Sequence, residues 1–351
     1  MATKTARWTS SRLWPAPQYA SKRTASSSGF PAPAGSVQEI AHQSLQQESR
    51  EYFAALSPDL DKGMALQHEF RRHMSMQPTL VSYWRIVWTM ALTVRVLRLD
   101  IAGDIIETGV YTGGTTISML YVMQQHERAF SKRLWACDSF RGTPAAESQD
   151  RDCTRLLDDG AKGAAGARSC NKGAAGWFQA KRSTFASNLR KFNVSNNHHR
   201  LHIVEGWYNE TLPPKGLKKI SLLRLDGDMY TSTRDALKAL YPLVVEGGLV
   251  YVDDYGSFAG CSRAVDEFLR SQPGGRPQLH RIVEPSPPNA STPWFFEAIW
   301  WVKPKQGGGA TTDGGAAGRL VAGAARGGGQ MKNPHVDLNA KAAARLEFDQ
   351  I

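Results

Sequence analysis

The sequence is poor in cysteine. Four cysteines occur in 351 residues, and they are scattered at Cys137, Cys153, Cys170 and Cys261. None forms a CxxC pair, so the chain lacks the usual spacing of a structural zinc site. So few thiols also exclude a disulfide scaffold in a chain of this length. We therefore expect free thiols in a reducing compartment.

The sequence also lacks a long apolar segment that is free of charges. Its most apolar stretch, residues 80–99, contains Arg85, Arg95 and Arg98, and charged side chains are costly inside a bilayer. No apolar signal segment opens the chain, so we expect neither a membrane partner nor secretion. Residues 1–38 contain no acid, which is typical of an organelle transit peptide or of a disordered tail. The expected location is therefore the cytoplasm, or a plastid or mitochondrion if the leader is a transit peptide.

The formal net charge of +11 would ordinarily suggest a nucleic-acid partner. Almost half of this excess lies in the leader, however, and more lies in a segment rich in glycine and alanine, residues 145–176. The motifs described next are acidic, and acidic side chains repel phosphates. We therefore expect a small-molecule substrate and no nucleic acid. The sequence leaves the oligomeric state open, with a homo-oligomer among the alternatives.

Carboxylates follow two apolar runs between residues 221 and 255. The run 222–225 ends on Asp226-Gly227-Asp228, and the run 249–252 ends on Asp253-Asp254. Each run predicts a buried strand. The carboxyl ends of parallel strands meet at one edge of a sheet, where ligands bind. Four carboxylates at that edge repel one another unless they share a cation or a proton, and oxygen ligands of this kind favour Mg²⁺.

Apolar residues at helical spacing over 236–241 predict a helix between these strands. Pro242 and the Gly247-Gly248 pair are predicted to close it. The order strand, helix, strand is that of a βαβ unit in a parallel sheet. The sequence thus predicts an α/β fold with helices on both faces of a mostly parallel sheet.

A second signal lies between residues 104 and 138. A short apolar strand ends on Glu107-Thr108-Gly109, with Gly113-Gly114 opening the next helix. A glycine-rich turn lets a ligand approach the backbone, and the helix amino terminus favours an anionic group. The following strand ends on Asp138-Ser139, at a spacing that suits a carboxylate binding ribose hydroxyls. The alternative for Asp138 is a cap or turn residue.

Taken together and in this order, the motifs resemble the macrocin O-methyltransferase family, the metal-dependent sugar methyltransferases of macrolide and aminocoumarin pathways. The resemblance covers roughly residues 80–302. It is carried by five segments, namely Glu107–Val110 with Gly113-Gly114, Asp138–Gly142, Gly206-Trp207, Leu225–Tyr230 and Gly248–Tyr255.

The resemblance implies a Rossmann-like methyltransferase fold that uses S-adenosylmethionine and Mg²⁺ to methylate a hydroxyl of a sugar or another diol-bearing molecule. It implies that Asp226, Asp253 and Asp254 bind the metal and that Asp228 is the general base. The cofactor-binding residues implied are Glu107, Thr108, Gly109, Val110, Gly113, Asp138, Ser139, Gly206 and Trp207. Tyr111-Thr112 stands where the family usually has Trp-Arg, and residues 145–176 replace a substrate-contacting segment, which leaves the acceptor open.

The expected organisation has four parts. Residues 1–38 form a disordered leader or transit peptide, and residues 39–100 form a helical cap. Residues 101–305 form the methyltransferase domain, with 145–176 as a low-complexity insertion, and residues 306–351 form a disordered tail.

Other interpretations stay open for four features. Asp226-Gly227-Asp228 also resembles the DxD motif of metal-dependent glycosyltransferases, and the whole domain could be a methyltransferase fold kept for binding a partner. Asp228 could instead be a helix N-cap, because Thr231-Ser232-Thr233 begins a helix. Trp207 and Tyr208 could stack on an adenine or simply pack.

Overall fold

The computed structural model describes residues 58–68, 79–126, 131–151, 175–192, 200–273, 275–285 and 294–305. All of them belong to one compact unit, Ser36–Ile351. The predicted leader, the predicted tail and most of the predicted insertion, together with Cys153 and Cys170, lie outside the described residues.

A seven-stranded sheet forms the centre of this unit, in the order β3-β2-β1-β4-β5-β7-β6. The first five strands in this order are parallel, and β7 pairs antiparallel with both β5 and β6. The strands are β1 (Asp104–Thr108), β2 (Leu134–Asp138), β3 (Leu201–Glu205), β4 (Ile220–Leu225), β5 (Val244–Val252), β6 (His280–Pro285) and β7 (Trp294–Val302).

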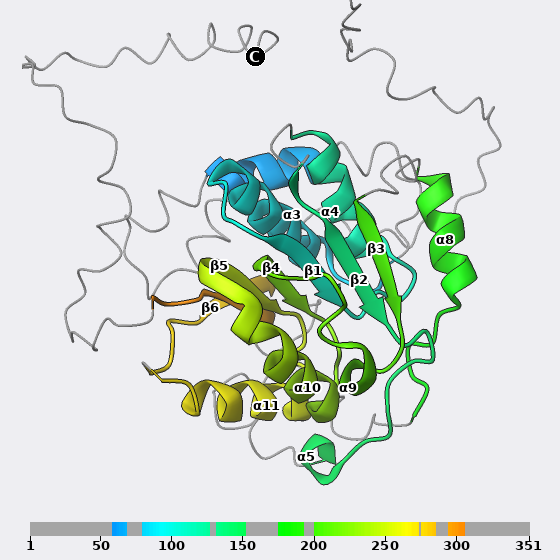
Figure 1. The fold of residues 1–351 in the computed structure, drawn as a ribbon, viewed down its shortest axis with the longest axis vertical. Helices are drawn as coiled ribbons and strands as arrows, with labels where there is room; N and C mark the ends of the chain where they lie inside the picture. Colours follow the sequence, from blue (N-terminus) through cyan, green and yellow to red (C-terminus); the bar gives the residue numbers. More distant parts are fainter. Residues whose placement is uncertain are drawn as a thin grey trace, which may run out of the picture. The chain divides into compact units, whose positions relative to one another are not determined.

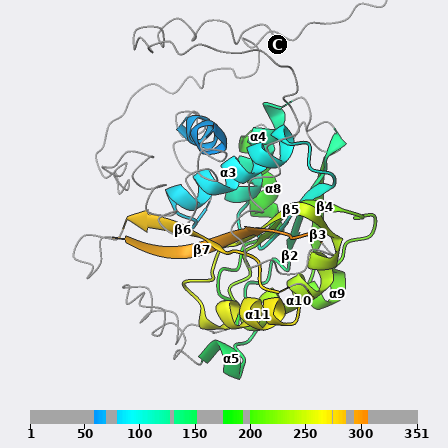
Figure 2. The ribbon, with the colours of Figure 1, turned by 90° about the vertical axis from the view of Figure 1, so that its left-hand side faces the viewer.

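Helices cover both faces of the sheet (Figures 1 and 2). On one face lie α3 (Tyr83–Arg98), α4 (Gly114–Gln124) and α8 (Arg182–Lys191), and on the other lie α10 (Tyr230–Leu240) and α11 (Ala259–Arg270). The described part also contains α5 (Ser148–Arg151), α9 (Tyr208–Thr211), the 3₁₀ turn η4 (Tyr241–Leu243) and a helical segment at residues 58–68. The predicted α/β class with helices on both faces is confirmed.

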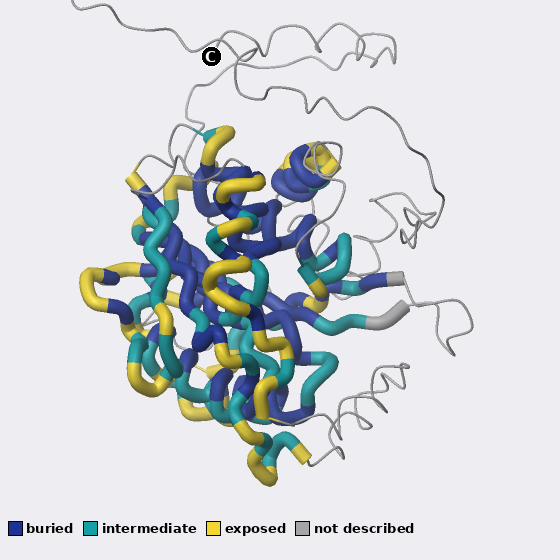
Figure 3. Tube along the Cα trace, turned by 90° about the vertical axis from the view of Figure 1, so that its right-hand side faces the viewer, coloured by how far each residue is buried: buried dark blue, intermediate teal, exposed yellow. Residues whose placement is uncertain are grey.

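Neighbouring residues on each strand supply two separate cores. Leu222 packs into the core beneath α3 and α4, whereas Leu223 packs into the core beneath α10 and α11. Trp300 and Trp301 on β7 divide in the same way, and Trp300 lies beside Trp88 of α3. Successive side chains of a strand point to opposite faces, so a strand covered on both sides must be apolar throughout. This explains why every residue of the central strands β1 and β4 is buried, and why the middle of the molecule is dark blue in Figure 3.

An ion-pair cluster attaches the helical segment 58–68 to the outer part of α3. Asp59 is fully buried and accepts from Arg95 at 2.9 Å and from Arg98 at 2.8 Å. These arginines, with Arg85, are the charges that made a membrane span costly in the sequence. Among the described residues, no helix combines the length and apolar character needed to cross a bilayer.

The structure corrects the sequence-based boundaries at two places. Gly247 and Gly248 were predicted to lie between helix and strand, but β5 begins at Val244 and contains both. The register between β4 and β5 shifts there, with Ile220 opposite Val244 and Leu222 opposite Leu249, so the pairing of the two strands is irregular at the glycines. Strand β6 was not predicted, because only two adjacent residues of its six, Ile282 and Val283, are aliphatic.

Candidate functional site

A cavity of about 850 Å³ opens at the carboxyl ends of β1, β4 and β5. The chain runs outward from β1 through β2 to β3 and then returns to place β4 on the other side of β1. This reversal is the point at which α/β sheets bind ligands. Each of the five motif segments contributes at least one lining residue, and residues 79–81 and Arg85, before and within α3, line the cavity as well.

The glycine turn after β1 lies directly against Asp226. Gly109 has φ +89°, and a Cβ built on it would lie 1.6 Å from the carbonyl oxygen of Asp226. The Asp226 amide in turn donates to the carbonyl oxygen of Thr108 at 2.8 Å. Only glycine tolerates both this conformation and this approach. The turn is therefore in contact with the carboxylate motif of β4.

Glu107 lies behind this turn and not in the cavity wall. Its carboxylate is fully buried, accepts from the hydroxyls of Thr115 and Thr116 on α4, and pairs with Arg224 at 3.1 Å. Burial raises the pKa of Glu107 to about 7, although Arg224 opposes the shift. Glu107 thus connects β1, α4 and β4 just beneath the glycine turn.

Asp138 connects the same turn to the loop after β2. Its Oδ2 accepts from the amides of Val110 at 2.7 Å and Tyr111 at 2.9 Å, and its Oδ1 accepts from the amide of Phe140 at 2.6 Å. Asp138 and the buried Ser139 both line the cavity. The contacts of Asp138 in this structure are therefore those of a turn residue, as the alternative expected. Asp138 nevertheless lines the cavity.

The remaining cofactor candidates divide into lining and supporting residues. Gly109, Val110 and Trp207 line the cavity, whereas Thr108, Gly113 and Gly206 are not among its lining residues. At Gly113 a Cβ would lie 2.3 Å from the Phe185 ring, so this glycine lets α8 approach the start of α4. The structure therefore gives Gly113 a packing contact.

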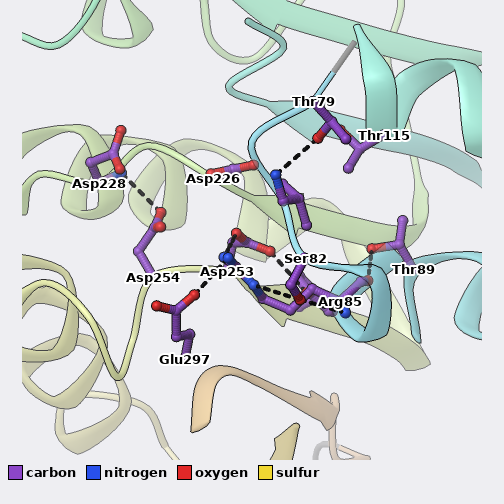
Figure 4. Close-up of polar contacts among 12 residues, drawn as sticks. Thr79, Ser82, Arg85, Thr89, Thr115, Asp226, Asp228, Asp253, Asp254 and Glu297 are labelled. Carbon is purple, nitrogen blue, oxygen red and sulfur yellow. Dashed lines mark hydrogen bonds and ion pairs between the residues drawn. The ribbon is translucent and has the colours of Figure 1, made fainter. Parts of the chain in front are cut away.

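The three predicted metal ligands converge (Figure 4). Asp226 follows β4, and Asp253 and Asp254 follow β5; each offers an oxygen, and these oxygens all lie within 4.8 Å of one another. Asp253 and Asp254 are buried, and Asp226 is partly exposed to the cavity. Parallel pairing of β4 with β5 brings the two strand ends together, as the sequence predicted.

Two arginines bond the carboxylates of Asp226 and Asp253. Arg224, fully buried on β4, bonds Asp226 at 2.7 Å and Asp253 at 2.8 Å. Arg85 of α3 pairs with the other oxygen of Asp253, with Glu284 at 3.2 Å and with Glu297 at 2.6 Å. Even so, acids outnumber these two cations around the cavity.

Crowding of like charges shows in the ionisation of the acids. Burial, then the charge of Asp253, raises the pKa of Asp226 to about 6. Burial, then neighbouring carboxylates, also raises the pKa values of Asp228 and Asp254 well above the ordinary aspartate value. A cation among these groups would reduce their mutual repulsion and would stabilise their charged forms against the cost of burial.

Asp228 lines the cavity two residues beyond Asp226. Its backbone is in the left-handed region, with φ +58°, and its amide donates to Asp254 Oδ2 at 3.1 Å. The N-cap residue of α10 is Met229, which makes no side-chain cap. The expectation that Asp228 caps this helix is therefore wrong.

Sequence reasoning missed the two arginines. Arg224 was read as part of an apolar run, and Arg85 only as an obstacle to a membrane span. A charged residue within a buried strand requires partners, so the position of Arg224 was itself the available signal. His280 is buried and stacks on Trp300, away from the cavity-lining residues.

Comparison with known proteins identifies the family. Residues 73–282 match the family described as Macrocin-O-methyltransferase (TylF). Demethyldecarbamoylnovobiocin O-methyltransferase of Streptomyces niveus is 34% identical over 180 residues, covering 49% of this chain and 60% of that protein. The 8-demethyl-8-(2,3-dimethoxy-alpha-L-rhamnosyl)-tetracenomycin-C 4'-O-methyltransferase of Streptomyces olivaceus is 31% identical over 196 residues, covering 55% of this chain and 68% of that protein. The chain thus spans less than two thirds of the first relative.

The fold agrees with this assignment. The solved structure of the O-methyltransferase NovP superposes with a TM-score of 0.51 at 25% identity, covering 65% of this chain and 83% of that chain. The family match takes in more than half of the sequence and includes the motifs after β1, β2, β4 and β5. The chain therefore belongs to the macrocin O-methyltransferase family.

Proposed function

We propose that this protein is an S-adenosylmethionine-dependent O-methyltransferase that uses Mg²⁺ to methylate a hydroxyl on a sugar or another diol-bearing small molecule. One observation carries the proposal. The carboxylates of Asp226, Asp253 and Asp254 gather in the same cavity as the Gly109 turn, which supports a metal site beside a cofactor site.

The residues present fit a divalent cation. The donor atoms are carboxylate oxygens, which hard cations prefer, and they lie within 4.8 Å of one another. Octahedral Mg²⁺ with bonds of about 2.1 Å places its ligand oxygens about 3 to 4 Å apart, so the carboxylates need only a small inward movement. We assign Asp226, Asp253 and Asp254 as the metal ligands, with Arg224 bonded to Asp226 and Asp253 and Arg85 bonded to Asp253.

The cofactor supplies an electrophilic methyl group, and the cation supplies positive charge that lowers the pKa of a neighbouring hydroxyl. The chain's own residues provide position and a proton acceptor. The Gly109-Val110 turn gives a surface for the methionine part of the cofactor, with Glu107, Thr108 and Gly113 holding its shape. A carboxylate has about four acceptor sites, so Asp138 keeps one for a ribose hydroxyl while binding three amides. Ser139, Gly206 and Trp207 complete the cofactor side.

Asp228 is the proposed general base. As the new O–CH₃ bond forms and the S–CH₃ bond breaks, the acceptor hydroxyl must lose its proton, and Asp228 faces the cavity beside Asp254. Because Asp228 does not cap α10, its carboxylate is available for this step. Orientation of the acceptor opposite the sulfur accounts for much of the expected rate.

The acceptor class is proposed from the relatives. The Streptomyces olivaceus protein is described as acting at the 4' oxygen of a rhamnosyl compound, and a sugar with neighbouring hydroxyls suits a cavity with a metal site. The DxD alternative is weaker, because a glycosyltransferase does not require the Gly109 turn or the Asp253-Asp254 pair. A binding module without activity would not require an ordered set of metal ligands.

Two measurements test the function. Calorimetry should show binding of S-adenosylhomocysteine and of Mg²⁺, and no binding of nucleotide sugars. Labelled S-adenosylmethionine, offered with small-molecule extracts and with demethyldecarbamoylnovobiocin as a probe, should label a product in Mg²⁺ and not in EDTA. Binding of nucleotide sugars alone would overturn the proposal in favour of glycosyl transfer, and binding of neither would favour the non-enzymatic alternative.

A further inference from the structure

The first amide of α10 is capped from a distant part of the chain. The amide of Tyr230 has no acceptor within its own helix, because it belongs to the first turn. It donates instead to Oδ1 of Asp150 at 2.7 Å, eighty positions earlier in the sequence. Asp150 belongs to the short helix α5, which Figures 1 and 2 show below α10 and α11. Met229 occupies the N-cap position of α10, and its side chain makes no capping hydrogen bond.

Asp150 fits closely between the starts of two helices. A Cβ built on Gly260, in the first turn of α11, would lie 1.8 Å from Asp150 Oδ1 and 2.9 Å from the Tyr230 amide nitrogen. Its other oxygen, Oδ2, accepts from the Glu147 amide at 2.9 Å and closes its own turn. A carboxylate is favoured here, because the amino ends of both helices carry partial positive charge.

The segment that Asp150 fixes is a wall of the cavity. Residues 141–145, which precede α5, all line the cavity. Thr143 and the returning chain exchange two backbone hydrogen bonds, from the Thr143 amide to Trp177 at 2.8 Å and from the Gly176 amide to Thr143 at 2.8 Å. Asp150 therefore connects the segment that follows this wall to the first residue of α10.

The same contact bears on Asp228. The amides of residues 228 to 230 have three different acceptors: Asp254 Oδ2 for Asp228, the Gly227 carbonyl for Met229, and Asp150 Oδ1 for Tyr230. Asp228 itself is in a left-handed conformation that an aspartate holds only when its surroundings fix it. Asp150 supplies the last of these three bonds, and it comes from α5, which directly follows the lining residues 141–145.

We propose that Asp150 is a positioning residue that fastens the wall of residues 141–145 to the start of α10 and thereby holds Asp228 toward the cavity. The attachment stands on the geometry alone. Its consequence for methyl transfer rests on the proposed function, in which Asp228 is the general base.

Three variants and a control test the proposal in the full-length protein. Asp150→Ala removes the acceptor. Asp150→Asn keeps an oxygen that can accept from Tyr230, so it serves as the conservative variant. Gly260→Ala leaves Asp150 in place but pushes its carboxylate away. Ser148→Ala is the matched control. Ser148 is an exposed residue of the same helix, and its hydroxyl donates to the neighbouring Gln149.

Residue-resolved hydrogen exchange gives the direct readout. We expect Asp150→Ala and Gly260→Ala to speed exchange of the Tyr230 amide at least tenfold and to speed that of the Asp228 amide as well. Asp150→Asn should stay within threefold of the parent protein, and Ser148→Ala should match it. Unchanged exchange at Tyr230 in both disrupting variants would overturn the attachment, and a change confined to Tyr230 would overturn the positioning of Asp228.

Kinetics separates positioning from general damage. With demethyldecarbamoylnovobiocin as the acceptor probe, kcat should fall about tenfold or more in Asp150→Ala and Gly260→Ala, with recovery in Asp150→Asn, since small displacements of a reacting group are costly. Affinity for S-adenosylhomocysteine should change less than threefold. Equal losses of kcat and cofactor affinity would contradict the proposal. If the parent protein neither binds the cofactor nor transfers methyl groups, the proposed function fails, and exchange at Asp228 still decides the positioning role.

Discussion

The acids at the two ends of β1 differ in how many donors and cations surround them. At the amino end, Asp104 accepts from Arg133 at 2.9 Å and from the Trp135 indole at 3.0 Å, so a single acid has donors to spare. At the carboxyl end, Glu107 shares Arg224 with Asp226 and Asp253, so one cation serves three acids. A site arranged for stability pairs its charges locally, whereas a site short of cations is ready to bind one.

The largest expected effect comes from removing one acid at each end. Asp226→Asn should lower methyl transfer at least 100-fold, because it removes a metal ligand and a charge beside the reacting groups. Its free energy of unfolding should be unchanged or higher, since repulsion is relieved. Asp104→Asn should do the reverse and cost about 1 to 3 kcal/mol of stability with transfer retained. Urea unfolding and the labelled-methyl assay measure both, and equal behaviour of the two variants would remove the distinction between the ends.

The next effect comes from removing one arginine at each end. Arg224→Met should destabilise the protein by about 3 to 5 kcal/mol, because it leaves buried carboxylates without their cation. Mg²⁺ should restore part of this loss. Arg133→Met should cost only about 1 kcal/mol, since the Arg133 side chain is 39% exposed. Thermal and urea unfolding with and without Mg²⁺ give the comparison, and no response of Arg224→Met to Mg²⁺ would argue against a metal at these carboxylates.

The last effect concerns the pH dependence of stability and Glu284, which pairs with Arg85 as Asp253 does. Burial raises the pKa of Glu284 to about 7, with Arg85 opposing. Between pH 4.5 and 7 the folded protein then keeps a proton that the unfolded chain has released, so stability falls as pH rises through this window. The contribution is on the order of 3 kcal/mol.

Urea unfolding of Glu284→Gln at pH 5, 6, 7 and 8 checks this expectation. The variant should show a flatter pH dependence than the parent protein, because its amide does not titrate. Glu205→Gln, at an exposed position on β3, should leave the slope as it was. An unaltered slope in Glu284→Gln would show that another group titrates in this window.

The sequence was informative where one local pattern determined the structure. The apolar runs at 222–225 and 249–252 predicted β4 and β5 because strands covered on both faces admit little else. The acids that follow them could be placed together because parallel strands end at a common edge.

The sequence did not predict hydrogen bonds and ion pairs between residues that lie far apart in the chain. The Arg224 contacts with Glu107 and Asp253 depend on strand neighbours that only the sheet order reveals. The bond from the Tyr230 amide to Asp150 joins residues eighty positions apart, and no pattern near either of them predicts it. The alternative role of Asp228 as a helix cap followed a sound local rule and is wrong, because Met229 occupies the N-cap position and the distant Asp150 accepts from the Tyr230 amide.

The position of β7 has a consequence for biosynthesis. This strand pairs with β5 and β6 and places Trp300 in one core and Trp301 in the other. A ribosome delivers it after every other described element of the sheet. Neither helical layer can finish packing until residue 301 has left the exit tunnel, so the nascent chain exposes apolar surface that favours aggregation until then.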